Sequence, residues 1–387
     1  RDLRMSRGLG DVYKRQEWKR LGNNRSRNIL IISGLFVMLL IAVFLIYNGR
    51  RRDYDERIVG FIMNGRIDGN GWNAEQYAGI KEACDDLDIK LLVRESIEEG
   101  TGKCREAIED LIGKGAGAIV LLSYNYVQEA DDVIKANKNI VFYTTDAESI
   151  AENVIPYFSR LYQARYLSGI IAGMETKSGK IGYVAAMDNS EVNRGINAFA
   201  LGVQRVNKDA VVIVKRTGSW ENKSEEVAAA DKLIDAGADV LTCHQNIGYS
   251  IEEADRKGIY TIGYHSTPED VSDKMLTSIE CDWSAIYSII LSEYSKGTSG
   301  RQSHYWIGIE DGAVSLSSYS DDVTDDMKTE VAKAKDEITG GRDVFSGVIF
   351  DNKGELRCMR GETMTDDNIL NNVDWLVKGV QLYEEET

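Results

Sequence analysis

Short apolar runs alternate with longer amphipathic stretches along most of this chain, beginning at Arg57. Such runs are typical of buried parallel strands, and apolar positions every three or four residues are typical of helices that cover a sheet. The pattern therefore predicts a parallel sheet wrapped by helices. The predicted strands are 57–63, 89–94, 117–122 and 139–144, and the predicted helices are 74–87, 101–114 and 126–137.

The same pattern starts again after Pro156. The segments LIGKGAGAIVLLS at 111–123 and LIDAGADVLTCH at 233–244 both predict a helix, a glycine turn and a buried strand. Two similar units predict an α/β protein of two doubly wound, Rossmann-like lobes, with a ligand site beyond the carboxyl ends of the strands. The second set of predicted strands is 180–185, 210–215, 238–242 and 259–263, and its helices are 160–175, 191–206, 223–236 and 249–257.

An uncharged apolar run, ILIISGLFVMLLIAVFLIY, occupies residues 29–47. This length suits one transmembrane helix, and a buried core helix is the alternative. No small-residue cleavage site and no nearby cysteine for lipid attachment follow it, so we expect an uncleaved signal anchor. Flanking basic residues favour a cytoplasmic segment 1–28, a linker 48–56 and an extracytoplasmic binding domain. Residues 1–16 resemble a translated sequencing adaptor and are left out of the fold prediction.

The charge is distributed unevenly along the chain. Residues 1–57 carry 13 Lys or Arg and 6 Asp or Glu, a net charge of +7, whereas the whole chain carries −16. The remaining 330 residues therefore carry −23. Such an acidic domain repels phosphate backbones, so nucleic-acid binding is not expected.

The sequence carries no pattern typical of an enzyme. The first predicted strand leads into Asn64-Gly65-Arg66-Ile67-Asp68, which is neither a dinucleotide fingerprint nor a P-loop. The five cysteines are widely spaced, so scattered thiols are expected, although Cys84 and Cys104 lie on consecutive predicted helices. The acidic run at 321–326 is interpreted as a loop before a helix at 327–339. No catalytic residue, metal site or cofactor is predicted.

Several phrases of the chain resemble the basic membrane protein (BMP) family of solute-binding proteins, whose members include purine nucleoside receptors. The phrases are DGNGWNAEQYAGIKEA at 68–83, FYTTDAE at 142–148, YQARYLSGIIAGMETKSGKIGYV at 162–184, GSWENKSEEVAAADKLIDAGADVL at 218–241, YTIGYHS at 260–266, and the tail from 345 to 380. The resemblance implies the type I periplasmic-binding-protein fold, in which the chain crosses between lobes three times. We place the crossings near 155, 277 and 300, which gives lobes of 57–155 plus 278–299 and 156–277 plus 300–387.

The resemblance also implies residues that hold a ligand. Asp68 matches an acidic residue that binds a purine edge, and Asp146 matches a carboxylate that binds ribose hydroxyls. Trp72 and Tyr77 in the first lobe and Trp220 in the second supply aromatic rings that stack on a base. The other candidates are Asn73 of the same motif and four residues that follow predicted strands, Ser123, Asn125, Gln245 and Asn246. Turn formation, helix capping and core packing are the alternatives for these side chains.

Two positions depart from the family pattern. His265 stands where the family has an aspartate, and Cys281 lies where a lysine follows the late hinge strand. These departures leave the sugar end of a nucleoside in question, so His265 joins the candidate ligand-binding residues.

The resulting expectation is a monomeric receptor, not an enzyme, that captures a purine nucleoside or base for an ABC importer. Its partners would be the permease and ATPase of that transporter. The alternative is a membrane-tethered sensor with the same two-lobed fold, which the missing lipid-acceptor cysteine favours.

Overall fold

The computed structural model describes residues 38–40, 57–67, 71–123, 125–145, 151–265, 272, 274–297 and 303–384. Ile58–Thr387 form one compact unit, which contains both predicted lobes. Of the predicted anchor at 29–47, only residues 38–40 are described, and these are helical and exposed. Within the described part of the chain, no helix is long and apolar enough to cross a membrane.

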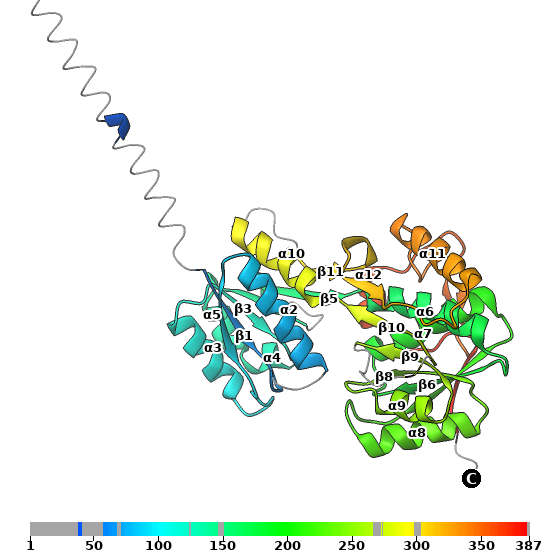
Figure 1. The fold of residues 1–387 in the computed structure, drawn as a ribbon. Coiled ribbons are helices and arrows are strands. Elements are labelled where there is room, and N and C mark those ends of the chain that lie inside the picture. The colour runs from blue at the N-terminus through cyan, green and yellow to red at the C-terminus, as the bar shows by residue number, and fades with distance from the viewer. Residues whose placement is uncertain are drawn as a thin grey trace, which may run out of the picture. The chain divides into compact units, whose positions relative to one another are not determined.

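The first lobe is built on a six-stranded parallel sheet in the order β11-β5-β4-β3-β1-β2 (Figure 1). Four of its strands confirm the four strands predicted for this lobe, and two further strands, β5 and β11, extend the sheet at one edge. The strands are β1 (Ile58–Ile62), β2 (Lys90–Arg94), β3 (Ala118–Leu121), β4 (Val141–Thr144), β5 (Val154–Ser159) and β11 (Tyr305–Ile307).

Helices cover both faces of this sheet, because its central strands are apolar on both sides. In β3, Val120 packs toward a cluster with α2 (Trp72–Asp86) and α10 (Trp283–Lys296), whereas Leu121 packs toward the opposite cluster. That opposite cluster contains α3 (Lys103–Gly113), α4 (Tyr126–Glu129) and α5 (Asp131–Ala136). The lobe is therefore doubly wound, as predicted.

The second lobe has a seven-stranded sheet in the order β12-β10-β9-β8-β6-β7-β15, parallel except for the antiparallel edge strand β12. Its strands are β6 (Lys180–Ala185), β7 (Val211–Arg216), β8 (Val240–His244), β9 (Tyr260–Tyr264), β10 (Met275–Cys281), β12 (Val314–Leu316) and β15 (Val380–Leu382).

Two helical layers enclose the second sheet (Figure 1). One layer contains α6 (Leu161–Glu175), α7 (Ser190–Val206) and α11 (Asp325–Thr339), and the other contains α8 (Lys223–Asp235) and α9 (Tyr249–Arg256). α6 and α7 pack closely, since a Cβ added at Gly169 would lie 2.1 Å from the backbone oxygen of Phe199. This packing fixes the first turns of both helices beside the ends of the strands.

The chain crosses between the lobes after β5, β10 and β11. β5 belongs to the first sheet and leads to α6, β10 belongs to the second sheet and leads to α10, and β11 returns to the first sheet before β12. Each crossing therefore lies a few residues later than the positions near 155, 277 and 300 that the sequence suggested. β5 and β11 stay largely apolar up to their crossings, so hydrophobicity alone does not mark where the chain leaves either strand.

The C-terminal segment packs on the second lobe. It contains the hairpin β13 (Ile349–Phe350) and β14 (Leu356–Cys358), the short helix α12 (Asp366–Asn371), and β15 at the sheet edge. Asn197 of α7 donates to the backbone oxygen of Trp375 at 2.9 Å and accepts from the backbone nitrogen of Val377 at 2.8 Å. The five cysteines are free thiols.

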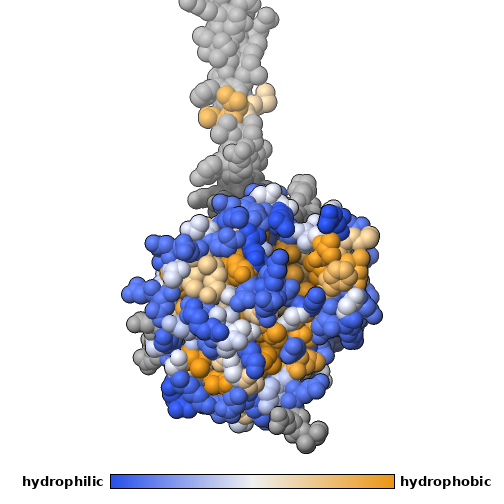
Figure 2. All heavy atoms as spheres, turned by 90° about the vertical axis from the view of Figure 1, so that its right-hand side faces the viewer, coloured by the Kyte–Doolittle hydropathy of each residue, from blue (hydrophilic) through white to orange (hydrophobic). Residues whose placement is uncertain are grey.

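One face of this unit is mostly hydrophilic, with smaller apolar areas between the polar ones (Figure 2). The exposed apolar side chains of the C-terminal segment include Val348, Phe350, Leu356, Met359 and Leu382. The predominantly polar surface agrees with the acidic composition of this part of the chain.

Candidate functional site

The two lobes touch at the carboxyl ends of their strands. Gly71, which precedes α2 in the first lobe, has φ 87°, and a Cβ added there would lie 2.8 Å from the backbone oxygen of Asn246 in the second lobe. Only glycine combines this conformation with so close an approach. The cleft between the lobes is therefore closed at this point.

Five aromatic rings form a continuous row between the lobes. Trp72, the first residue of α2, lies 6.0 Å from His265, which follows β9. His265 lies 3.8 Å from Tyr264, Tyr264 lies 4.6 Å from His244, and His244 lies 6.1 Å from Trp220, all between ring centroids. The two tryptophans that the sequence singled out thus stand at opposite ends of one row.

Trp72 also packs against aromatic residues at the crossings. Its ring is stacked on Phe158 of β5 at 5.9 Å and meets Trp283, at the start of α10, edge-on at 5.0 Å. Ring pairs at these separations stabilise each other by roughly 0.5–1.5 kcal/mol beyond the area they bury. The position of Trp72 is therefore coupled to two crossing segments.

The polar residues after β3 are held by one carboxylate. Glu99 accepts hydrogen bonds from Ser123 Oγ at 2.5 Å, from the backbone nitrogen of Asn125 at 3.0 Å and from Asn125 Nδ2 at 3.0 Å. Asn64 Nδ2 donates to Ser123 Oγ at 3.2 Å. Burial acts to raise the pKa of Glu99, but the hydrogen bonds from Ser123 and Asn125 outweigh it and lower that pKa. Glu99 is thus an ionised support for this edge of the cleft.

The residues after β8 support the loop that carries Trp220. With its amide nitrogen turned toward that loop, Gln245 donates to the backbone oxygens of Ser219 at 2.9 Å and Trp220 at 3.1 Å, and accepts from Thr217 Oγ1. The backbone nitrogen of Asn246 donates to the backbone oxygen of Trp220 at 2.9 Å. Both predicted polar residues therefore help to position the tryptophan.

A small hollow, open to solvent and with room for about one water molecule, lies behind the ring row, between α6, α7 and the ends of β5, β8 and β9. Arg165 of α6 is almost completely buried, and its guanidinium carbon lies 3.9 Å from the ring centre of Tyr264. Tyr264 Oη and His244 Nε2 are 3.0 Å apart. Within the described part of the chain, Arg165 Nε and Nη2 and His244 Nδ1 have no hydrogen-bond partner. Glu191 and Arg194 of α7 add charged groups to the lining, and Phe158 of β5 adds an apolar one.

His244 is uncharged at neutral pH in this environment. Burial lowers its pKa to about 4, although Glu191, whose carboxylate lies 3.8 Å away, opposes the shift. A neutral imidazole both donates and accepts a hydrogen bond, which suits recognition of a polar ring edge.

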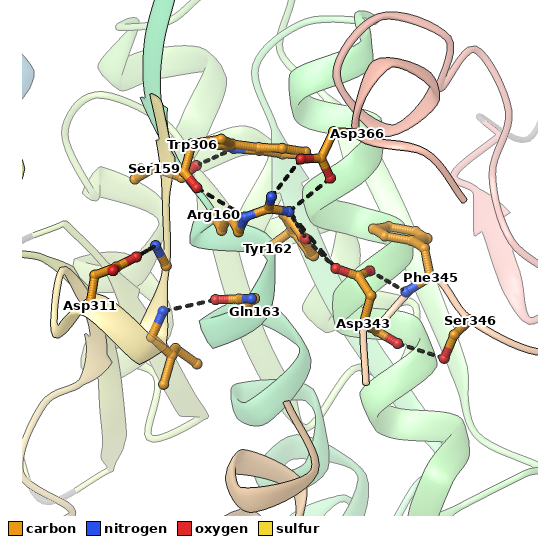
Figure 3. A network of polar contacts seen from close by, with 12 residues as sticks. Ser159, Arg160, Tyr162, Gln163, Trp306, Asp311, Asp343, Phe345, Ser346 and Asp366 are labelled. Atoms are coloured by element: carbon orange, nitrogen blue, oxygen red, sulfur yellow. Dashed lines mark hydrogen bonds and ion pairs between the residues drawn. The ribbon is translucent and has the colours of Figure 1, made fainter. Parts of the chain in front are cut away.

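The hinge side of the site is fixed by Arg160, which lies directly after β5 (Figure 3). Its Nη2 donates to Asp366 Oδ2 at 2.6 Å and its Nη1 to Asp366 Oδ1 at 3.1 Å, while its Nε donates to the backbone oxygen of Trp306 at 3.0 Å. Tyr162 donates to Asp343 at 2.6 Å in the same network. Two crossing segments and the C-terminal segment are thereby joined through one guanidinium group.

Comparison with known proteins shows the family of this chain. A sequence model of the Bmp family, described as ABC transporter substrate-binding protein PnrA-like, matches residues 57–342. The chain belongs to the Bmp family. A purine-binding protein of Brucella abortus is 30% identical over 326 residues, which cover 83% of this chain and 92% of that protein.

Other relatives carry different descriptions. A putative ABC transporter glucose-binding protein of Haloferax volcanii is 33% identical over 206 residues, or 53% of this chain and 52% of that protein. The crystal structure of a transcriptional activator of the comK gene from Bacillus halodurans has a TM-score of 0.66 at 20% identity, covering 74% of this chain and 99% of that one. This likeness confirms the two-lobed α/β fold expected of the family.

The predicted ligand-binding residues around the start of α2 lie in different environments. Asn73 Oδ1 accepts from the backbone nitrogen of Gly65 at 3.3 Å, so it supports the loop after β1. Tyr77 is half-buried against the core of the first lobe. The predicted acidic residues Asp68 and Asp146 lie outside the described residues.

The sequence predictions missed the polar hollow and its anchor residues. Arg165 is the sole charged residue in the interior of the apolar helix LYQARYLSGIIAGME, and that isolation was the signal that pointed to it. Glu99 and Glu191 lie in acidic, exposed-looking segments, so nothing local distinguished them. Among the described residues, no group of three His, Cys, Asp or Glu side chains is arranged to hold a metal ion.

Proposed function

We propose that this Bmp-family chain is an extracytoplasmic receptor that captures a purine nucleoside or base between its lobes and delivers it to an ABC importer. The observation that carries the proposal is the ring row from Trp72 to Trp220, which spans both lobes. A flat aromatic ring can stack on the face of any base, and each stacking contact contributes about 1–3 kcal/mol. The identity to a purine-binding protein over most of both chains supports the same ligand class.

Recognition in this proposal divides between the lobes. Rings from both lobes contact the base, and the neutral His244 and the strand-end carboxylates Asp68 and Asp146 supply hydrogen-bonding groups. A ligand that contacts both lobes binds the closed form more tightly than the open form, and this difference drives closure about the crossings. Residues 29–47 would tether the receptor to the membrane.

A thermal-shift panel with the purified full chain tests the ligand class. The panel contains adenosine, guanosine, inosine, adenine, hypoxanthine, glucose, ribose and several amino acids. We expect stabilisation by at least one purine, because a ligand that binds the folded state alone raises its stability. A clear shift with glucose and none with any purine would replace the ligand class while leaving the fold intact.

A membrane-tethered sensor is the second candidate. It is favoured by the structural likeness to a transcriptional activator, which shows that this fold also serves regulatory proteins. Crosslinking of the full chain in its native membrane separates the two: an importer permease is expected as the partner of a transport receptor, and a regulatory protein as the partner of a sensor.

A further inference from the structure

Glu75 and His265 meet across the cleft. Glu75 lies in the first turn of α2 in the first lobe, and His265 directly follows β9 in the second lobe. His265 Nδ1 lies 3.7 Å from Glu75 Oε2, and the two side chains are 6% and 25% exposed. Because the residues belong to different lobes, opening the cleft separates them and returns both to water.

His265 is held firmly in this position. Its φ is 65°, a left-handed conformation that histidine adopts more readily than most residues but that still costs free energy. Its backbone nitrogen donates to the backbone oxygen of Ile279 at 2.9 Å, which ties it to β10. The backbone at His265 is therefore fixed, and its ring packs against those of Tyr264 in its own lobe and Trp72 in the first lobe.

The charged surroundings differ on the two sides of the contact. Glu75 faces Glu280 and Cys281 of β10, with Asp282 next along the chain, so its neighbours are acidic or neutral. Burial and then the charge of Glu280 raise the pKa of Glu75 from 4.5 to about 7.

His265 has the opposite surroundings. It faces His244 of β8 and Arg165 of α6, together with the rings of Tyr264 and Trp72. Burial, then the interactions with His244 and with the guanidinium of Arg165, lower its pKa from 6.5 to about 3. The charge of Glu280 reaches Glu75 from the opposite lobe, whereas Arg165 and His244 belong to the same lobe as His265. Closure therefore adds burial to His265, and adds both burial and a nearby carboxylate to Glu75.

We propose that Glu75 and His265 form a proton-exchanging contact, in which closure of the lobes passes the imidazolium proton of His265 to the carboxylate of Glu75. In the molecules whose His265 is protonated in the open form, one N–H bond breaks and one O–H bond forms, so both groups enter the closed interface uncharged without exchanging a proton with solvent. The pair keeps closure nearly independent of pH between about 5 and 8, since open and closed forms bind similar numbers of protons. The inference rests on the lobe closure of the proposed function and not on which ligand is bound.

Removing either side chain leaves the titration of the other uncompensated. The two variants are therefore expected to respond to pH in opposite directions. In Glu75→Gln, the open form binds a proton on His265 that the closed form cannot hold, so acidification below 6.5 favours opening. In His265→Gln, the closed form holds a proton on Glu75 that the open form loses, so acidification below 7 favours closing. A purely structural contact would not give profiles of opposite slope.

Single-molecule FRET on the ligand-free full chain measures the ratio of closed to open molecules directly. The dyes are attached at Glu82→Cys on α2 and Glu225→Cys on α8, both exposed and on different lobes, and the chain without these cysteines gives the background from native thiols. The ratio is measured between pH 5 and pH 8 for the wild type, each single variant and the double variant. Circular dichroism at each pH confirms that every variant is folded.

From pH 8 to pH 5 we expect the ratio to change by no more than about threefold in the wild type, to fall more than about tenfold in Glu75→Gln, and to rise more than about tenfold in His265→Gln. The double variant is expected to be flat. The inference is overturned if both single variants follow the wild-type profile, if the double variant keeps a strong dependence that another group such as Glu280 must cause, or if no variant opens at any pH. Failure of the purine panel leaves these outcomes unaffected, because no ligand is used.

Discussion

Trp72 and Trp220 lie in different lobes, yet three intervening rings, His265, Tyr264 and His244, join them into one row. The row begins at the first residue of α2 and ends in the loop after β7. Any movement that separates the lobes has to break it between Trp72 and His265. That break exposes Trp72 on one lobe and His265 on the other.

The hinge network gives a prediction for stability. Asp366→Asn removes the charge that receives both Nη groups of Arg160, so we expect it to lower the free energy of unfolding by about 1–3 kcal/mol. Asp367→Asn is the matched control, because it removes a carboxylate from the same first turn of α12, where that group bonds only Asn371 in the described residues. Urea denaturation of both variants measures the difference. Equal effects would show that the helix terminus, and not Arg160, accounts for the loss.

The buried guanidinium of Arg165 gives a second prediction. Arg165→Met keeps most of the packing and removes the guanidinium charge. The Nε and Nη2 atoms of that guanidinium have no hydrogen-bond partner in the described residues. We expect its free energy of unfolding to remain within about 1 kcal/mol of the wild type or to rise, whereas Arg165→Ala loses buried packing and falls by about 2 kcal/mol or more. Thermal and chemical denaturation compare the two. If methionine were as damaging as alanine, the charge itself would be stabilising the second lobe.

The buried carboxyl group of Glu226 in α8 gives a prediction for how the free energy of unfolding depends on pH. Its side chain is fully buried, and burial raises its pKa from 4.5 to about 7. The folded state therefore binds this proton more tightly than the unfolded state, and the stability that results is present below about pH 4.5 and is lost as pH rises to 7.

Glu226→Gln should remove that loss. We expect the variant to be more stable than the wild type at pH 8 and similar to it at pH 5, measured by the midpoint of urea denaturation. Glu225→Gln changes the exposed neighbouring position and is expected to match the wild type at both pH values. A Glu226→Gln variant that gained nothing at pH 8 would contradict the assigned titration.

The architecture of the two lobes followed from hydrophobic periodicity. The runs that became β1, β3, β6 and β8 are apolar because helices cover both faces of each sheet. The crossings were less accurately placed. β5 (VIPYFS) stays largely apolar as far as Phe158, and the point where it leaves the first lobe depends on pairing with β11, which lies far along the chain.

The site was predictable where a motif placed it and not where distant segments meet. Trp72 and Trp220 were found from the resemblance to the family, and both flank the cleft. The contact of Glu75 with His265, and the bond of Glu99 to Ser123, arise from residues that are far apart in sequence. Neither pair has a local pattern, because tertiary packing alone brings the partners together.

The central claim is that both lobes stack on a purine, and titration calorimetry of the full chain tests it most directly. The titrant is the purine that gives the largest thermal shift, and the chains compared are the wild type, Trp220→Ala and Tyr260→Ala, the last removing an aromatic ring at the opposite end of β9. We predict micromolar or tighter binding to the wild type and to Tyr260→Ala, with a loss of about 1–3 kcal/mol in Trp220→Ala. Purine binding that is unchanged by Trp220→Ala, or heat only from a sugar or an amino acid, would contradict the account.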